Sequence, residues 1–487
     1  MLKLQDLCVA HDATLMEAMK AIDANAQGIL FVQKNNIFQG TLTDGDIRRA
    51  LISGADNQDV LGPHCNLNAM SLHISSSDND IIRSLYKSEI NMIPLLNDDG
   101  IVVDFATKSS LSRYPVMEPL LNGREKEYVI DCIDSNWISS QGAYVEKFET
   151  GLSEICDVEF CISTSSGTTA LHLALLALDL GVGDEVIVPN LTFGASVNSI
   201  LHSGATPVLV DVASDDWNLC PQKMMDAITP NTKAIMAVHL YGNPCQMDKI
   251  MGIAKDHDLL VIEDCAEALG AKILGKPVGS FGDAAAFSFF ANKVITSGEG
   301  GAVAFKESHY AEKAKILRDH GMAKNKRYWH EFVGYNYRMT NIQAAIGCAQ
   351  LEQLEFFTTR REEIWAIYSR ELMSSGYFLD QKVHVGSTPC RWLYTLLLNP
   401  KLSIYRDQLI EELRLLGIDT RPIFYPMSDM PAFQDKVNMS AELESSEDIS
   451  LSGLSFPSSV SLSESEIVSI SRSTLEEIEK LIALNGI

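Results

Sequence analysis

The chain has 487 residues, of which 46% are hydrophobic and 21% charged, and its formal net charge is −25 because 64 acidic residues outnumber 39 basic ones. This length predicts about two to four domains, and the acidity argues against a nucleic-acid partner, which would bind clustered lysine and arginine. No apolar run reaches the ~20 residues that span a bilayer, and the N-terminus lacks a signal-peptide pattern. Ten single cysteines without metal-ligand spacing indicate reduced thiols and no metal site. We therefore expect a cytoplasmic protein without a membrane partner.

Residues 1–112 contain one pattern twice, a short helix followed by a strand pair. The first copy has Leu15–Ile22, Gly28–Val32 and Gly40-Thr41-Leu42-Thr43-Asp44-Gly45-Asp46, and the second has Asp80–Tyr86, Met92–Leu96 and Gly100–Asp104. The segment resembles a CBS-domain pair, and its Gly40–Asp46 motif matches that family's nucleotide-contacting pattern. By this resemblance, Thr43 would contact a phosphate and Asp46 the ribose hydroxyls of a regulatory nucleotide. A purely architectural role is the alternative, because the second copy lacks the motif.

Residues 113–353 alternate apolar strand-like and helix-like runs, which predicts an α/β domain with a mainly parallel sheet covered on both faces. The expected strands are Glu185–Pro189, Pro207–Val212, Ala234–His239, Leu259–Glu263, Ala284–Phe289 and Gly301–Phe305. The expected helices are Thr168–Leu178, Ser196–Leu201, Pro221–Ala227 and Met247–Lys255. In such sheets, ligands bind at the loops beyond the carboxyl ends of the strands.

The turn Ser165-Ser166-Gly167-Thr168-Thr169 precedes one of these helices. The free N–H groups and the positive dipole end of that helix suit a phosphate. Gly167 lets the backbone approach closely, the Thr168 hydroxyl adds a donor, and Ser288 could donate to the same phosphate. An ordinary helix cap is the alternative.

Asp264 ends the apolar run Leu259–Ile262, where a carboxylate needs a cation or a donor. Lys293 follows the strand Ala284–Phe289 through a short turn, so its amine could reach the sheet edge. An amine, a buried carboxylate and a phosphate-sized turn are what pyridoxal 5′-phosphate requires. Phe193, just after another strand, is placed to stack on the cofactor ring. The alternatives are a strand-end cap for Asp264, a solvated Lys293 and core packing for Phe193.

Residues 354–487 read as a small α+β domain. They contain the charged helix Leu354–Glu371, strand-like Trp392–Leu398 and the helix Arg406–Leu416. The Ser- and Glu-rich stretch Ser440–Ser473 is interrupted by apolar residues, and it overlaps a helix-like run, Ser463–Leu484. We expect an ordered loop and a terminal helix there.

From about Tyr114 onward, the chain resembles the DegT/DnrJ/StrS family of sugar aminotransferases, which have the type I aminotransferase fold. The motifs that carry the resemblance are the three elements above with Gly183–Pro189, Ala237–Gly242 and Gly334–Ile342. The resemblance implies that Lys293 is the Schiff-base lysine and that Asp264 pairs with the pyridinium nitrogen. It also implies that Gly167, Thr168 and Ser288 hold the phosphate while Phe193 covers the ring.

The same resemblance implies a homodimer or higher assembly, because the Asn336 loop would reach the cofactor phosphate of the neighbouring subunit. Whether Asn336 or Arg338 makes that contact stays open. Glu267 stands where many members have glutamine or histidine facing the ring's phenolic oxygen. At Glu267, Asn292 and Tyr328-Trp329-His330, the sequence resembles the GDP-perosamine synthase subgroup of the family.

The resemblance implies transamination of a nucleotide-linked keto-sugar, a 4-keto-6-deoxyhexose, with glutamate as the amino donor, in surface polysaccharide or glycan assembly. Loops around Tyr241 and His330 would select the sugar. Two alternatives are a nucleotide-sugar dehydratase, in which histidine replaces the lysine, and a catalytically inactive, nucleotide-sensing CBS fusion.

Overall fold

A computed structural model of the chain describes residues 3–87, 90–107, 114–323, 325–326, 328–440 and 442–486. The chain divides into two units, Met1–Tyr114 with Arg414–Ile418, and Pro115–Leu413 with Asp419–Ile487. The expected domain limit at Ser112 lies among residues 108–113, outside the described residues. The limit expected after residue 353 lies within the larger unit, at the start of helix α12 (Leu354–Leu372).

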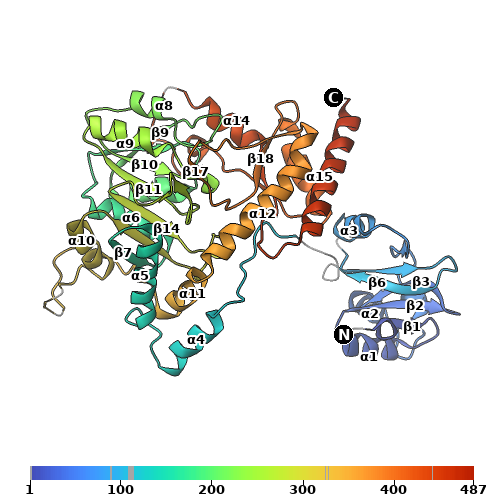
Figure 1. Ribbon diagram of the computed structural model, residues 1–487. Helices are drawn as coiled ribbons and strands as arrows, with labels where there is room; N and C mark the ends of the chain where they lie inside the picture. Colours follow the sequence, from blue (N-terminus) through green and yellow to red (C-terminus); the bar gives the residue numbers. More distant parts are fainter. Residues whose placement is uncertain are drawn as a thin grey trace. The chain divides into compact units, whose positions relative to one another are not determined.

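The smaller unit contains two three-stranded sheets with one topology (Figure 1). In each sheet, the middle strand pairs parallel with the strand before it and antiparallel with the strand after it. The strands are β1 (Cys8–Ala10), β2 (Ile29–Lys34), β3 (Ile37–Thr43), β4 (Leu72–His73), β5 (Met92–Leu96) and β6 (Val102–Thr107). The helices are α1 (Leu15–Asn25), α2 (Asp44–Ile52) and α3 (Asp78–Lys87). Leu7, Phe31, Met92 and Val102 form a core shared by the two copies, so the repetition expected from the sequence is present in the strand topology.

The larger unit is built on an eight-stranded sheet with the order β20-β9-β8-β10-β11-β14-β15-β7. All neighbouring strands are parallel except β15, which is antiparallel to both β14 and β7. The strands are β7 (Phe160–Thr164), β8 (Glu185–Pro189), β9 (Thr206–Val210), β10 (Thr232–Val238), β11 (Leu260–Asp264), β14 (Ala284–Ser288), β15 (Gly301–Phe305) and β20 (Asn438–Met439). The carboxyl ends of all strands but β15 therefore meet at one edge of the sheet.

Helices cover both faces of this sheet. Successive residues of a strand point to opposite faces, and here the side chains on both faces are apolar and need to be buried. Val186 and Val188 of β8 pack with α6 (Gly167–Ala177), α7 (Gly194–Ser203) and α10 (Ser308–Arg318). Ile187, between them, packs with α8 (Pro221–Asp226) and α9 (Met247–Asp256) on the other face. A further core joins α4 (Glu125–Asp134), α5 (Ala143–Cys156) and α11 (Asn341–Leu351) to β14 and β15.

The C-terminal part carries a four-stranded antiparallel sheet with the order β16-β18-β21-β19. Its strands are β16 (Phe378–Leu379), β18 (Thr395–Leu398), β19 (Arg421–Pro422) and β21 (Gly453–Ser455). Helices α12, α13 (Arg406–Leu415), α14 (Glu444–Ser452) and α15 (Glu464–Asn485) belong to the same part, and α12 runs alongside α15 (Figure 1). A small sheet of β12 (Lys272–Ile273), β13 (Lys276–Pro277) and β17 (Ser387–Thr388) lies apart from it. The four-stranded sheet and its helices form the small α+β region expected from the sequence. The expectation of a loop before the terminal helix is wrong in part, because Ser440–Ser473 contains α14 and β21.

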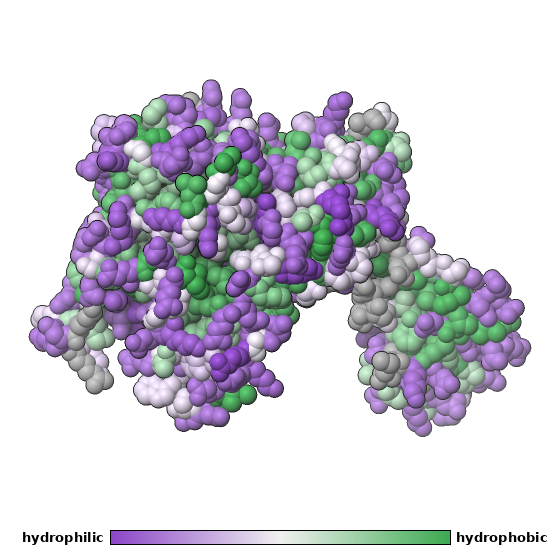
Figure 2. All heavy atoms as spheres, in the orientation of Figure 1, coloured by the Kyte–Doolittle hydropathy of each residue, from purple (hydrophilic) through white to green (hydrophobic). Residues whose placement is uncertain are grey.

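Hydrophilic side chains cover much of the visible surface of the larger unit, in keeping with the acidic composition (Figure 2). Hydrophobic side chains gather on part of the visible face of the smaller unit. In the part of the chain that the structure describes, no helix combines the length and the apolar character needed to cross a membrane.

Candidate active site

The loops that follow five strands bring the predicted site residues to one edge of the main sheet. The turn at Ser166 and Gly167 follows β7, Phe193 follows β8, Tyr241 follows β10, and Asp264 ends β11. Ser288 ends β14 and leads into the turn that carries Lys293. Because β15 runs the opposite way, Gly301 at its start lies beside both Ser288 and Thr164. This is the edge at which a ligand is expected in an α/β sheet.

Helix α6 begins at Gly167 with a local cap made by its neighbours. Ser166 Oγ accepts from the Thr169 backbone N–H at 3.2 Å, and Thr169 Oγ1 accepts from Ser166 N–H at 3.1 Å. Thr168 takes no part in this cap. A Cβ atom on Gly167 would lie 2.7 Å from Cβ of Ser288, so only glycine permits this approach of the turn to β14. Gly167, Thr168 and Ser288 therefore meet at a helix N-terminus, which suits an anionic phosphate.

Asp264 is a buried carboxylate with two local donors and no bonded cation among the described residues. Its Oδ2 accepts from Ser196 Oγ at 2.8 Å, and its Oδ1 accepts from Ala266 N–H at 3.1 Å. Burial raises the pKa of Asp264, although these two bonds and the charge of Lys293 oppose the rise. A carboxylate in this position is stabilised by a cation placed against it. The protonated ring nitrogen of pyridoxal phosphate is such a cation.

The Lys293 amine lies between a carboxylate and an aromatic ring. Its Nζ is 3.5 Å from Glu267 Oε1 and 3.9 Å from the centroid of the Trp392 ring. Glu267 is buried, and its other oxygen accepts from Tyr241 N–H at 2.9 Å. Burial raises the pKa of Glu267, and the charge of Lys293 opposes that rise. The amine is therefore held inside the site, with 13% of the Lys293 side chain exposed.

Two predicted aromatic residues occupy different environments. Phe193 caps the start of α7 and is 60% exposed, with its ring 5.8 Å from that of Phe424. Tyr241 is 4% exposed and is stacked between Phe424 and Trp392, at centroid distances of 5.4 and 5.9 Å. Phe193 therefore has an open ring face for a cofactor. Tyr241 packs against neighbouring aromatic side chains and donates its N–H to Glu267, and its contact with the sugar stays a prediction.

The segment that carries His330 and Asn336 bonds to the end of α10 and to the turn before α6, where Ser165 N–H donates to the Tyr337 carbonyl oxygen at 2.8 Å. His330 Nδ1 lies 2.7 Å from the His320 carbonyl oxygen. Asn336 is exposed, and its Oδ1 accepts from Arg338, which also pairs with Asp319 at 2.8 Å. Within the described residues, no hydrogen bond joins this segment to Asp264, Glu267 or Lys293. Asn336 and Arg338 bond to each other, so both proposed phosphate contacts lie at one place in this segment.

One buried cluster near the site consists of residue types that can bind a metal, but hydrogen bonds within the protein already occupy the ligand atoms of its histidine and glutamate. His239, Glu263 and Cys265 are the group among the described residues whose ligand atoms lie within 4.8 Å of one another. His239 Nδ1 accepts from Cys245 N–H, so its Nε2 carries the proton and donates to Glu263. The remaining Glu263 acceptors bind three backbone N–H groups in residues 279–282. Burial would raise the pKa of Glu263, but these bonds hold it below its ordinary value. The cluster thus fixes the strand end that carries Asp264.

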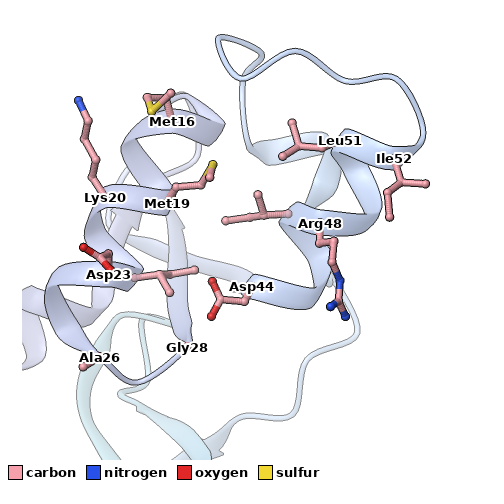
Figure 3. Close-up of a pocket in the computed structure, with 12 residues that line it drawn as sticks. Met16, Met19, Lys20, Asp23, Ala26, Gly28, Asp44, Arg48, Leu51 and Ile52 are labelled. Carbon is pink, nitrogen blue, oxygen red and sulfur yellow. The ribbon is translucent and has the colours of Figure 1, made fainter.

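Thr43 and Asp46 of the smaller unit form the cap of helix α2. Thr43 Oγ1 and N–H both donate to Asp46 Oδ2, at 2.6 and 2.9 Å, and Arg49 pairs with the other Asp46 oxygen at 2.5 Å. A cavity of about 780 Å³ lies elsewhere, between α1 and α2, with Met16 and Met19 on one side and Leu51 and Ile52 on the other (Figure 3). Neither Thr43 nor Asp46 lines it. The cavity is therefore not the nucleotide site that these two residues would form.

Two residues that contact the site, Ser196 and Trp392, are not among those predicted from the sequence. Ser196 lies one helical turn after Phe193, so its position on α7 was a usable signal once Phe193 had been placed at the edge. Trp392 comes from the C-terminal part, 100 residues beyond the Asn292 carbonyl to which its indole N–H donates at 2.6 Å. No local pattern around Trp392 indicates this contact.

Residues 119–474 match the DegT/DnrJ/EryC1/StrS aminotransferase family. The chain is 48% identical to GDP-perosamine synthase of Caulobacter vibrioides over 361 residues, which are 74% of this chain and 96% of that protein. It is 45% identical to GDP-perosamine synthase of Escherichia coli O157:H7 over 362 residues, 74% of this chain and 98% of that protein.

Two solved structures are similar over the same part. One is the Helicobacter pylori aminotransferase involved in the biosynthesis of pseudoaminic acid, with a TM-score of 0.72 and 30% identity, covering 76% of this chain and all of that one. The other is an aminotransferase from Psychrobacter cryohalolentis, with a TM-score of 0.70 and 32% identity, covering 76% of this chain and 99% of that one. Neither the family match nor these likenesses extend over the whole chain.

Proposed function

The chain belongs to the DegT/DnrJ/EryC1/StrS aminotransferase family, and on that premise we propose that it aminates a GDP-linked 4-keto-6-deoxyhexose. The predictions of an aminotransferase and of pyridoxal phosphate as its cofactor are confirmed. One observation supports the proposed cofactor site whatever the substrate is: Lys293, Asp264 and the contact between Gly167 and Ser288 lie at the same edge of the sheet.

The residues at this edge fit the cofactor, which when bound would draw electrons from the carbon that loses its proton. Lys293 would be the lysine that links to it. Asp264 would keep the ring nitrogen protonated, because a buried carboxylate with a raised pKa is stabilised by that cation. Gly167, Thr168 and Ser288 would hold the phosphate, and Phe193 would cover one ring face. Lys293 Nζ would take the proton from the α-carbon of the amino donor and would deliver it to the cofactor carbon rather than back to the donor.

Glu267 would face the phenolic oxygen of the cofactor. Two negative groups in contact repel each other unless one holds a proton. Burial raises the pKa of Glu267, which favours the protonated carboxyl in this position. A protonated Glu267 can donate to the phenolic oxygen, as a neutral glutamine would.

The proposed substrate class draws on the relatives that share most of this chain. GDP-perosamine synthases from two bacteria are 48% and 45% identical, and nearly their whole length is matched. Lys293 argues against the dehydratase alternative, in which histidine replaces the lysine. We propose glutamate as the amino donor and polysaccharide or glycan assembly as the setting. The segment around His330 is the proposed sugar-selecting loop, and Tyr241 would act there through its backbone contact with Glu267.

Product analysis by mass spectrometry tests this proposal. The full chain with pyridoxal phosphate and glutamate is offered GDP-, UDP- and dTDP-linked 4-keto-6-deoxy sugars, and Lys293→Ala is the control. We expect an amino sugar from the GDP-linked substrate and none from the control. If product formed only from a UDP- or dTDP-linked sugar, the proposal of a GDP-linked substrate would be wrong. A colourless protein that takes up no cofactor would support the inactive fusion instead.

We also propose a homodimer with shared active sites, and helix α4 supports it. Tyr128 and Cys132 are buried against the body of the larger unit, yet Ile130 and Ile133 are 45% and 56% exposed. Trp137 and Ile138, just beyond the helix, are also more than half exposed. A helix that is apolar on both sides is normally covered on both. We propose that a second subunit covers this face and that Asn336 or Arg338 of one copy reaches the cofactor phosphate of the other.

The smaller unit is proposed to be a CBS-domain pair that binds a regulatory nucleotide at Thr43 and Asp46. Its repeated topology and shared core support the first part. The helix cap accounts for both side chains without a ligand, so the architectural role remains the alternative. Calorimetry on the full chain with adenine and guanine nucleotides separates the two. Heat that is lost in Asp46→Asn, a variant that retains a cap-forming side chain, would support binding, and no heat would leave the architectural role.

A further inference from the structure

Trp392 meets the lysine turn at its backbone and at its amine. The side chain is 3% exposed, and its indole N–H donates to the carbonyl of Asn292, the residue before Lys293. The Trp392 ring lies under the Lys293 amine, with Nζ 3.9 Å from the centroid. Trp392, a residue of the C-terminal part, therefore contacts both the backbone just before Lys293 and the amine at the end of the Lys293 side chain.

Arg361 of α12 connects Trp392 to the other side of the lysine. Its guanidinium donates to the Trp392 carbonyl at 2.7 Å and to the carbonyl of Val294, the residue after Lys293, at 3.4 Å. Arg361 is 3% exposed, and burial lowers its pKa to about 10, so it is still charged at neutral pH. Among the described residues, no carboxylate pairs with it. The guanidinium also contacts the Met117 sulfur at 3.9 Å. A buried charge without an opposite charge beside it is costly, so these contacts fix the position of Arg361.

We propose that Trp392, fixed by Arg361, is a positioning residue that holds the Lys293 amine against Glu267 whenever the amine is not bonded to the cofactor. A charged amine is attracted to the face of an indole ring. The ring and the Glu267 carboxylate together give the amine one defined place. The inference rests on the proposed role of Lys293.

Plain core packing is the competing explanation for Trp392, because Tyr241 stacks on the same ring at 5.9 Å. Packing alone predicts that a substitution lowers thermal stability and leaves the reactivity of the Lys293 amine unchanged. The positioning role predicts that the amine becomes more reactive toward reagents. The two explanations therefore differ in a property of the cofactor-free protein.

The experiment compares Trp392→Leu, Trp392→Phe and Arg361→Lys with the wild-type protein. Trp365→Phe is the matched control, since Trp365 is a buried tryptophan that packs on Tyr394 and Arg391 rather than on Lys293. Acylation of Lys293 in each cofactor-free protein is followed by peptide mass spectrometry. We expect the rate to rise about three- to tenfold in Trp392→Leu, less in Trp392→Phe, and not in Trp365→Phe. Arg361→Lys should fall between, because lysine does not present the planar fork that reaches both carbonyls.

Kinetics of the loaded enzyme provide the second measurement. We expect kcat to fall about tenfold in Trp392→Leu, with the KM for the amino donor within about twofold, because the substrate contacts are untouched. Wild-type labelling rates in all three variants, at any change in melting temperature, would overturn the inference. If Trp392→Leu does not fold, Trp392→Phe and Arg361→Lys carry the test. Failure of borohydride to fix the cofactor on Lys293 in the wild-type protein would instead overturn the proposed function.

Discussion

Asp264 shows how one residue can be prepared for a ligand by its surroundings. Its carboxylate is oriented by Ser196 and Ala266, yet burial raises its pKa. We predict that Asp264→Asn lowers kcat/KM on the order of 10²–10³-fold, because removing one partner of a buried ion pair costs about 3–5 kcal/mol. Ser196→Ala, which removes one orienting bond, should cost about tenfold. Steady-state kinetics checks both, and full activity in Asp264→Asn would exclude the ion pair.

Glu267 gives a prediction about pH. Burial raises its pKa, so the folded protein holds this proton more tightly than the unfolded chain does. Its contribution to stability is complete below its ordinary pKa of about 4.3 and is lost as the pH rises through the raised value. Glutamine has no such dependence. The cofactor-free Glu267→Gln protein should therefore gain thermal stability relative to wild type as the pH rises above about 4.3. Melting curves that keep a constant separation over this range would contradict the raised pKa.

At the scale of residues, the sequence predicted the residues of the candidate site but not the residues that hold them in position. Lys293, Asp264, Gly167 and Ser288 each follow a strand or open a helix, so their local pattern indicates the sheet edge. Ser196 and Trp392 reach the site from 68 and 100 residues away from the groups they bond. Their roles depend on tertiary packing, which no local pattern contains. The roles assigned to the site residues stay predictions until they are measured.

At the scale of elements, the start of α6 can be tested with a matched pair of glycines. Gly167→Ala would place Cβ 2.7 Å from Cβ of Ser288, and such overpacking costs about 1–3 kcal/mol. Gly252 in α9 has open space around its would-be Cβ, so Gly252→Ala should raise the free energy of unfolding by about 0.5–1 kcal/mol. We expect weaker cofactor binding in Gly167→Ala and unchanged binding in Gly252→Ala, measured by absorbance titration. Equal affinities would mean that the turn does not hold the cofactor.

Strand and helix positions were largely readable from apolar runs, and one disagreement has a clear cause. The run Trp392–Leu398 was expected to be a strand, but β18 starts at Thr395. Arg391 has a positive φ of 54°, the Trp392 carbonyl accepts from Arg361, and Tyr394 N–H donates to Ser458 Oγ. Side chains thus form hydrogen bonds with the backbone N–H and C=O groups that would otherwise have paired with a neighbouring strand. The antiparallel direction of β15 likewise depends on its partners rather than on its own five residues.

At the scale of the whole molecule, shared active sites predict complementation between two defective variants. Lys293→Ala lacks the amine, and the double variant Asn336→Ala/Arg338→Ala lacks the groups proposed to reach the neighbour. In a mixed dimer, one site combines the intact lysine of one copy with the intact loop of the other. After unfolding and refolding a mixture, we expect about one quarter of wild-type activity, since about half of the dimers are mixed and each has one native site. Activity no greater than that of the separate variants would argue against shared sites.

The proposed mechanism requires that Lys293 carries the cofactor at this sheet edge. Borohydride reduction of the loaded, full-length protein, followed by peptide mass spectrometry, tests this most directly. We expect one modified peptide, which contains Lys293, and no modified peptide in the Lys293→Ala protein. Modification at another lysine, with Lys293 unchanged, would contradict the site and the mechanism built on it.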